Sequence, residues 1–197
     1  MLKKKIDIIA ITHFLYEIGT LRKVPRSHMQ TLLTSDLSDN IASHSYRVSV
    51  IGYLLSYLEN ADANKVVIMC LFHDSAESRS GDQNWVHKKY VKTFEDEIIT
   101  DQLINLPMQV ELTKIINEYR KRQSPESRIA KDADLLDQIL LLREYWWQGN
   151  QEVKKWSRGK EQEKRLLTKS AKLLAKEIFN QEPNEWWDKE WTATRRS

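Results

Sequence analysis

Hydrophobic positions repeat with a helical period over most of this chain. From residue 41 to residue 58 they recur in steps of four, three, four and three, which places them on one helix face: His44, Val48, Ile51, Leu55 and Leu58. The segment of about 63–78 is different, because its run Val66–Phe72 is apolar on nearly all sides. This pattern predicts a central, buried helix.

Five glycines and four prolines divide the rest of the pattern. Residues 21–26 are expected to be extended because Pro25 disfavours helix for the residue before it, and a long loop follows to about residue 39. Gly19 is expected to end the first helix, and Ser124 with Pro125 to start a later one. The predicted helices cover about residues 4–18, 41–58, 63–78, 87–105, 107–121, 125–148 and 151–181, with a short piece after Pro183. We predict an all-α orthogonal bundle with strands absent or trivial.

The composition fits one globular domain. The chain has 197 residues, of which 41% are hydrophobic and 30% charged, enough to build a core and too apolar for a disordered tail. Six of the seven tryptophans lie from Trp146 onward, which suggests C-terminal helices that cover a large apolar surface. We therefore predict a core at 1–150 and a C-terminal helical extension at 151–197 packed on it.

Several classes of protein are excluded by what the chain lacks. No segment approaches the roughly 18 consecutive apolar residues of a membrane span. The basic residues at the start are not followed by the apolar core that a signal peptide requires. The single cysteine, Cys70, lies in an apolar run and is expected in the core of a protein from a reducing compartment, so we predict a cytoplasmic location. A net charge of +3 is too small for the footprint of a duplex-DNA binder, and we expect no nucleic-acid partner. A net charge of +3 is compatible with an anionic small molecule as the ligand.

Asp74 follows the buried run and needs a partner, because an isolated carboxylate is costly to remove from water. With its neighbour His73 it could straddle one metal ion. A backbone group, or an arginine such as Arg47, could satisfy either residue instead.

Further polar residues favour a metal ion, rather than a backbone group or an arginine, as the partner of His73 and Asp74. His44 lies on an apolar helix face, and Glu77 follows His73 by four residues and Asp74 by three. The segment Lys131–Asp137 puts three carboxylates into an otherwise apolar helix, although spacing alone does not choose among Asp132, Asp134 and Asp137. Two imidazoles and two carboxylates suit Mn, Fe, Co, Ni or Zn better than Ca or Mg.

The ordered set of motifs resembles the HD-domain metal-dependent phosphohydrolases. His44, then His73-Asp74, then a distant Asp134 is similar to their H…HD…D signature. The resemblance to the 5′-deoxynucleotidase branch covers roughly residues 10–148 and rests on the following segments: Leu21-Arg22-Lys23-Val24-Pro25-Arg26, Ser43-His44-Ser45-Tyr46-Arg47, His73-Asp74-Ser75-Ala76-Glu77, Gly81-Asp82 and Lys131-Asp132-Ala133-Asp134. It implies an HD-domain orthogonal helical bundle with additional C-terminal helices.

The resemblance also implies roles for individual residues. One divalent transition metal would be bound by His44, His73, Asp74 and Asp134, the last chosen by the Lys-x-Ala-Asp pattern of the family. Glu77 would position or activate the attacking water, and Asp82 would contact the substrate near the scissile phosphate or the sugar. Lys23 falls where the branch commonly has an arginine near the phosphate. Further basic candidates for substrate binding are Arg22, Arg26 and Arg79.

The chain departs from the branch at two places. Val24 stands where some members carry a tryptophan that discriminates the sugar, and Gln83–Lys89 replaces an apolar, proline-containing stretch, so the sugar is left open. Lys88 and Lys89 fit a solvated helix start or a second phosphate contact. No remaining histidine repeats a pattern that would indicate a second metal.

Our leading hypothesis is a phosphomonoesterase that hydrolyses nucleoside 5′-monophosphates. The alternatives are a hydrolase of nucleoside triphosphates, alarmones or cyclic phosphodiesters, and a non-catalytic nucleotide-binding domain with a structural metal. Members of the family commonly dimerise, and the aromatic C-terminal helices offer apolar surface, so we expect a homodimer.

Overall fold

The computed structural model describes residues 6–188 and 190. The described residues are mostly helical, and their only β pairing is an isolated bridge between Pro25 and Asn40, which confirms the all-α prediction. The first two residues of the predicted helix 4–18 and the last seven of the predicted extension lie outside the described residues. None of the described helices has both the length and the apolar character needed to cross a membrane.

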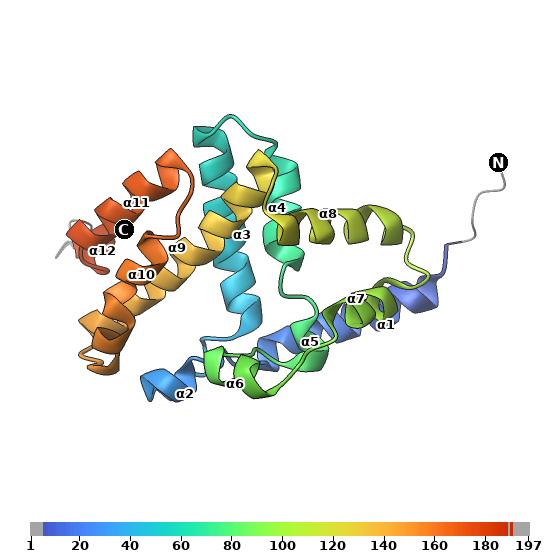
Figure 1. Ribbon diagram of the computed structural model, residues 1–197, viewed down its shortest axis with the longest axis horizontal. Coiled ribbons are helices and arrows are strands. Elements are labelled where there is room, and N and C mark those ends of the chain that lie inside the picture. Colours follow the sequence, from blue (N-terminus) through green and yellow to red (C-terminus); the bar gives the residue numbers. More distant parts are fainter. Residues whose placement is uncertain (1–5, 189, 191–197) are drawn as a thin grey trace, which may run out of the picture.

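Three helices form the centre of the molecule. In Figure 1, α9 runs across α3, and α4 lies beside both. Their bounds are Ile41–Leu58 for α3, Ala63–Phe72 for α4 and Pro125–Trp147 for α9. Each begins at a side-chain cap, from Asn40, Asp62 and Ser124 respectively, and Pro125 takes the first turn of α9 as predicted.

The remaining elements surround this centre (Figure 1). On the N-terminal side are α1 (Ile8–Gly19), the 3-10 helix η1 (Thr20–Lys23) and α2 (Met29–Leu32). Between α4 and α9 the chain forms α5 (Glu77–Ser80), α6 (Trp85–Tyr90), α7 (Glu95–Leu103) and α8 (Gln109–Lys121). After α9 come the 3-10 helix η2 (Glu152–Gly159), α10 (Lys160–Glu163), α11 (Lys169–Asn180) and α12 (Glu185–Asp188).

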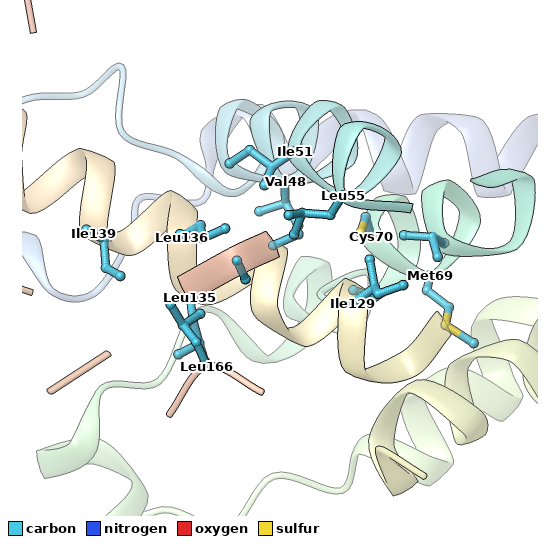
Figure 2. Packing of buried hydrophobic residues seen from close by; sticks show 14 of the residues in the cluster. Val48, Ile51, Leu55, Met69, Cys70, Ile129, Leu135, Leu136, Ile139 and Leu166 are labelled. Atoms are coloured by element: carbon cyan, nitrogen blue, oxygen red, sulfur yellow. The ribbon is translucent and has the colours of Figure 1, made fainter. Parts of the chain in front are cut away.

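The main core lies between α3, α4 and α9. Figure 2 shows Val48, Ile51 and Leu55 of α3 with Cys70 of α4 and Ile129 of α9, and all but Ile51, at 6%, are at most 1% exposed. The core position predicted for Cys70 is confirmed, and burial raises the pKa of its thiol. Gly52 allows the close approach of α3 and α4, because a Cβ there would lie 2.6 Å from the Cys70 sulfur. This packing fixes where α4 ends relative to α9.

Several predicted boundaries are wrong. Residues 20–23 are a 3-10 helix rather than extended, and the expected loop before residue 39 contains α2. The predicted helix 87–105 is interrupted between α6 and α7, and 151–181 is divided into η2, α10 and α11. The predicted helix 63–78 is also interrupted, since α4 ends at Phe72 and α5 starts at Glu77. The interruption at residues 73–76 places His73 and Asp74 at a helix end.

Candidate metal centre and its cavity

Two histidines from different helices meet at the end of α4. The Nε2 atoms of His44, on α3, and His73, at the C-cap of α4, lie 3.2 Å apart. Their Nδ1 atoms are engaged elsewhere, since His44 Nδ1 is 2.6 Å from Asp137 Oδ2 and His73 Nδ1 is 2.7 Å from the Cys70 carbonyl oxygen. Because these acceptors take the Nδ1 protons, each Nε2 presents a lone pair toward the other. Two facing lone pairs are stabilised by a positive charge between or beside them, either a proton on one Nε2 or a bound metal ion.

Two carboxylates complete the cluster. Asp74 Oδ2 lies 3.1 Å from His73 Nε2 and 3.5 Å from His44 Nε2. Asp134 Oδ1, from α9, lies 3.5 Å from His44 Nε2. Ligand atoms of His44, His73 and Asp134 all lie within 4.8 Å of one another. The structure therefore brings together the four residues predicted to be metal ligands.

The carboxylates of the 131–137 segment have three different environments. Asp132 is fully buried on another face of α9, where it accepts hydrogen bonds from the backbone of Leu167 and Thr168. Asp137 accepts from His44 and, at 2.5 Å, from Arg47 Nε. Of the three, only Asp134 reaches the facing Nε2 side of the histidine pair, whereas Asp137 contacts His44 at Nδ1, so the geometry makes the choice that spacing alone left open. Arg47, considered as a partner for His73 or Asp74, binds Asp137 and Glu144 instead.

The electrostatics of the cluster favour a positive charge at its centre. Burial and the charge of Arg26 lower the pKa of His44. The carboxylates of Asp137 and Asp74 raise it by more, and the resulting pKa is about 9. Burial raises the pKa of Asp74, yet the neighbouring histidines hold it well below its usual value. Burial also raises the pKa of Asp134, but neighbouring positive charges, chiefly that of Lys131, lower it by more. The field that favours protonated imidazole also favours a divalent cation.

Glu77 faces the cluster without a hydrogen-bonding partner. Its Oε2 atom is buried and accepts no hydrogen bond from any described residue. Burial raises the pKa of Glu77 to about 10, and the nearby charges of Asp74 and Asp82 act in the same direction. A bound divalent ion would oppose this shift by favouring the carboxylate. With such an ion bound, the Glu77 carboxylate would be available to take a proton from a water molecule at the cluster.

The predicted basic residues separate into two groups. Arg26 lies in the site, with Nη1 3.4 Å from Asp74 Oδ2 and Nε 3.7 Å from Asp82 Oδ2. Asp82 also accepts a 2.7 Å hydrogen bond from the Ser27 backbone. Arg22 and Lys23 are instead exposed on η1 and do not line the cavity. Arg26 is therefore the one basic residue of that motif that lines the cavity.

Arg79 does not line the cavity either. Its guanidinium forms a two-point ion pair with Glu17 on α1, with Nε 2.6 Å from Oε1 and Nη2 2.9 Å from Oε2. Ser78 and Gln102 donate to the same carboxylate, and the pKa of Glu17 is lowered, chiefly by Arg79. The geometry therefore gives Arg79 the role of fastening α5 to α1.

A cavity of about 370 Å³ opens from the cluster. Asp74, Glu77, Asp82 and Asp134 line its inner part, and Lys88, but not Lys89, lines it as well. Trp85 of α6 and Trp156 of η2 stack at its wall with ring centroids 5.0 Å apart. Trp156 belongs to the predicted extension 151–197, so residues from both sides of the predicted boundary line the cavity. The division into a core at 1–150 and an extension stays a prediction.

Some lining residues carried no recognisable signal in the sequence. Tyr119 of α8 has its hydroxyl 3.4 Å from Asp134 Oδ2, and burial raises the pKa of that hydroxyl well above its usual value. Lys131 belongs to the Lys-x-Ala-Asp motif, which does not by itself predict a contact, and its Nζ lies 2.5 Å from Asp134 Oδ2. Three arginines also line the cavity: Arg120 and Arg122 from the end of α8, and Arg165, which follows α10 and is brought to them by tertiary packing.

Comparison with known proteins finds two curated relatives. The chain is similar to the protein named 5′-deoxynucleotidase HDDC2 in Danio rerio, with 24% identity over 137 residues, covering 67% of this chain and 68% of that protein. The protein of the same name in Dictyostelium discoideum is 26% identical over 129 residues, covering 59% of this chain and 67% of that protein.

Solved structures share the fold. A conserved hypothetical protein from Pyrococcus furiosus has a TM-score of 0.72 and 25% identity, covering 86% of this chain and 99% of its own. A protein described as a predicted metal-dependent phosphohydrolase, from Magnetospirillum magnetotacticum, has a TM-score of 0.68 and 22% identity, covering 91% and 95%. The HD domain family model matches residues 18–178, which confirms the resemblance seen in the sequence. The chain belongs to the HD-domain family, and it is a metal-dependent phosphohydrolase.

Proposed function

We propose that this phosphohydrolase is a phosphomonoesterase that converts nucleoside 5′-monophosphates to nucleoside and inorganic phosphate. The names of the two curated relatives support this substrate class. The observation that carries the proposal is the pair of histidine Nε2 atoms, 3.2 Å apart beside two carboxylates, at the inner end of a cavity that also contains the unpaired Glu77.

His44, His73, Asp74 and Asp134 would hold one divalent transition metal. Two imidazole nitrogens and two carboxylate oxygens are a mixed donor set that suits Mn, Co, Fe, Ni or Zn. Asp137 and the Cys70 carbonyl keep both imidazoles in the tautomer that leaves Nε2 available. When bound, the ion would supply Lewis-acid polarisation of the phosphate and lower the pKa of the attacking water.

The remaining residues of the inner cavity handle protons and charge. Glu77 would accept the proton of the attacking water, because its carboxyl group lines the cavity and Oε2 has no competing donor among the described residues. Arg26 would hold Asp74 and Asp82 in place and bring positive charge near the phosphate, where negative charge grows on the oxygens. Asp82 would contact the sugar or the leaving-group side of the substrate.

A phosphate-release assay tests the proposal. Purified protein supplied with Mn²⁺ or Co²⁺ is given ribo- and deoxyribonucleoside 5′-monophosphates, 3′-monophosphates, 5′-triphosphates, an alarmone, guanosine tetraphosphate, and a cyclic phosphodiester. We expect 5′-monophosphates to be hydrolysed fastest, and the comparison of the two sugars decides the preference that Val24 leaves open. Asp74→Ala should abolish activity, while Glu161→Gln, at an exposed ion pair with Lys164, should not change it. Full metal-dependent activity of Asp74→Ala would overturn the proposal.

We also propose that the chain acts as a homodimer. Trp147 and Trp186, in the region expected to form the interface, are 48% and 80% exposed. A second apolar stripe lies on the outer face of α3, where the following side chains are all exposed: Tyr46, Val50, Tyr53, Leu54 and Tyr57. Light scattering during gel filtration measures the mass. Trp186→Ser and Tyr57→Ser then show which surface, if either, forms the interface.

A further inference from the structure

Two tryptophans form a stacked pair in the cavity that contains the candidate metal centre. The rings of Trp85, on α6, and Trp156, in η2, have centroids 5.0 Å apart and an interplanar angle of 21°. Both side chains line the cavity. Stacking places Trp156 against one face of the Trp85 ring, yet Trp85 is still 65% exposed. The pair therefore presents an aromatic surface that a ligand in the cavity can reach.

Trp156 is supported from the interior of the protein. It packs against a buried hydrophobic cluster formed by α2, α9 and η2. Its ring is also in edge contact with the imidazole of His28, with centroids 6.2 Å apart. His28 is fixed in turn, because its Nε2 lies 2.7 Å from Asp39 Oδ2 and both residues are buried. These contacts give Trp85 a backing whose position is set by the core.

The start of α6 is anchored as well. Asn84 caps the helix with its side-chain oxygen, and its Nδ2 donates to the Ser27 carbonyl oxygen over 3.3 Å. The Ser27 backbone N–H donates to Asp82 over 2.7 Å. Two contacts with one residue therefore hold the segment from Asp82 to Trp85, so the position of Trp85 relative to Asp82 is fixed.

The segment 26–28 joins the aromatic pair to the metal centre. Arg26 contacts Asp74 of the centre, and His28, two residues further along the chain, contacts Trp156. Two residues of fully extended chain span no more than about 7 Å. The cavity wall therefore passes over a short distance from charged side chains to aromatic ones.

This arrangement follows the order of groups in a nucleoside 5′-monophosphate. In such a molecule the sugar separates a dianionic phosphate from a planar, aromatic base. With the phosphate at the metal centre and the sugar beside Asp82, the base is left on the side of Trp85, which lines the same cavity three residues further along the chain. An indole ring suits a base because planar π-systems bind each other by offset stacking.

We propose that Trp85 and Trp156 form the nucleobase-binding site, with the base stacked on the open face of Trp85 and Trp156 supporting that ring from the other side. The proposal rests on the proposed function and adds a specificity element to it, since the pair favours nucleotides over phosphate monoesters that have no base. Stacking tolerates any base, because every base has a π-face. The site therefore selects for the presence of a base rather than for one base.

Equilibrium binding of two matched ligands tests the site without turnover. Metal-supplied Glu77→Gln protein is titrated with adenosine 5′-monophosphate and with methyl ribofuranoside 5-phosphate, which has the same phosphate and a closed ribose ring but no base. The nucleotide should bind about tenfold or more tightly, as is typical of one stacked base. Cytidine 5′-monophosphate should also bind more tightly than the base-free ester. Titration calorimetry gives the dissociation constants, and only the nucleotides should quench tryptophan fluorescence.

Substitutions in the same protein localise the effect. Trp85→Leu should bring the ratio of the two dissociation constants toward one and leave the affinity for the base-free ester unchanged. Trp85→Phe keeps an aromatic face and should retain most of the ratio. The matched control is Trp186→Leu, at a tryptophan that is 80% exposed and does not line the cavity, and it should keep both the ratio and the quenching.

Four results would overturn the base site. They are equal binding of nucleotide and base-free ester, no binding of either, tighter binding confined to the adenosine nucleotide, and a ratio that survives Trp85→Leu.

Phosphate release by the unsubstituted protein is measured separately. No release from any nucleotide, together with a binding ratio that depends on Trp85, would refute the proposed function and leave the base site standing. Release from nucleoside 5′-monophosphates without any binding ratio would refute the base site and leave the proposed function standing.

Discussion

His44 donates its Nδ1–H to Asp137 over 2.6 Å, and Asp137 is in turn held by Arg47. This contact fixes which nitrogen of His44 faces His73. An outer carboxylate of this kind typically contributes about 10–100-fold to metal affinity. Asp137→Asn should therefore weaken the binding of Mn²⁺ or Co²⁺ by about that factor, measured by titration calorimetry. Glu144→Gln, which removes only the other partner of Arg47, should have a much smaller effect. Equal effects of the two substitutions would contradict this role for Asp137.

Metal should stabilise the fold. An ion that binds only the folded chain adds about 2.7 kcal/mol to the free energy of unfolding when its concentration is 100 times its dissociation constant. We expect a chelator to lower the melting temperature and Mn²⁺ or Co²⁺ to restore it. His73→Ala should remove this response, whereas His13→Ala, at an exposed position of α1, should keep it. A metal response that survives His73→Ala would place the ion elsewhere.

Glu77→Gln should separate catalysis from metal binding. Loss of a general base typically costs about 10²–10⁴-fold in rate, and the amide keeps the size of the side chain. We expect kcat to fall by this factor while metal content, measured by elemental analysis, stays the same. Glu111→Gln, at an exposed position on α8, provides the control. Unchanged kcat in Glu77→Gln would show that another group takes the proton.

Asp132 and Asp134 should differ in what they support, although they are two residues apart. Asp132→Ala removes the acceptor of the Leu167 and Thr168 backbone N–H groups, so we expect a loss of about 1–3 kcal/mol in the free energy of unfolding. Its metal affinity should be largely kept. Asp134→Ala should lose metal binding instead. Denaturant titration and calorimetry on both variants check this contrast, and the opposite pattern would refute it.

Gly52 should not tolerate a side chain. A Cβ at this position would lie 2.6 Å from Cys70 Sγ and 3.0 Å from Val66 Cγ1, and overpacking of this kind typically costs about 1–3 kcal/mol. The higher helix propensity of alanine offsets about 1 kcal/mol of that cost. Gly52→Ala should therefore lower the free energy of unfolding, measured by denaturant titration. Cys70→Ala removes the clashing atom, so the double variant should be less unstable than the sum of the two single changes.

Local signals in the amino-acid sequence are sufficient to predict the helical class and the main elements of the centre. The apolar period of 41–58 predicted α3 with its observed bounds, and Ser124 with Pro125 predicted the start of α9. These features are local, because a cap and a period of 3.6 residues need no distant partner. The order of His44, His73-Asp74 and Asp134 was also sufficient to identify the family. Boundaries without such local signals, as in 151–181, were wrong.

Tertiary structure alone decided the geometry of the site. Spacing does not distinguish the three carboxylates of 131–137, and the family pattern that selects Asp134 gives no physical reason for the choice. They differ because α9 presents each to a different neighbour: the 167–168 backbone, the Nε2 side of the histidine pair, or His44 Nδ1 with Arg47. In the same way Arg26 enters the cavity, while Arg79 is engaged by Glu17. Charge and hydrogen-bonding energies depend on distances between residues far apart in the chain, and only packing sets those distances.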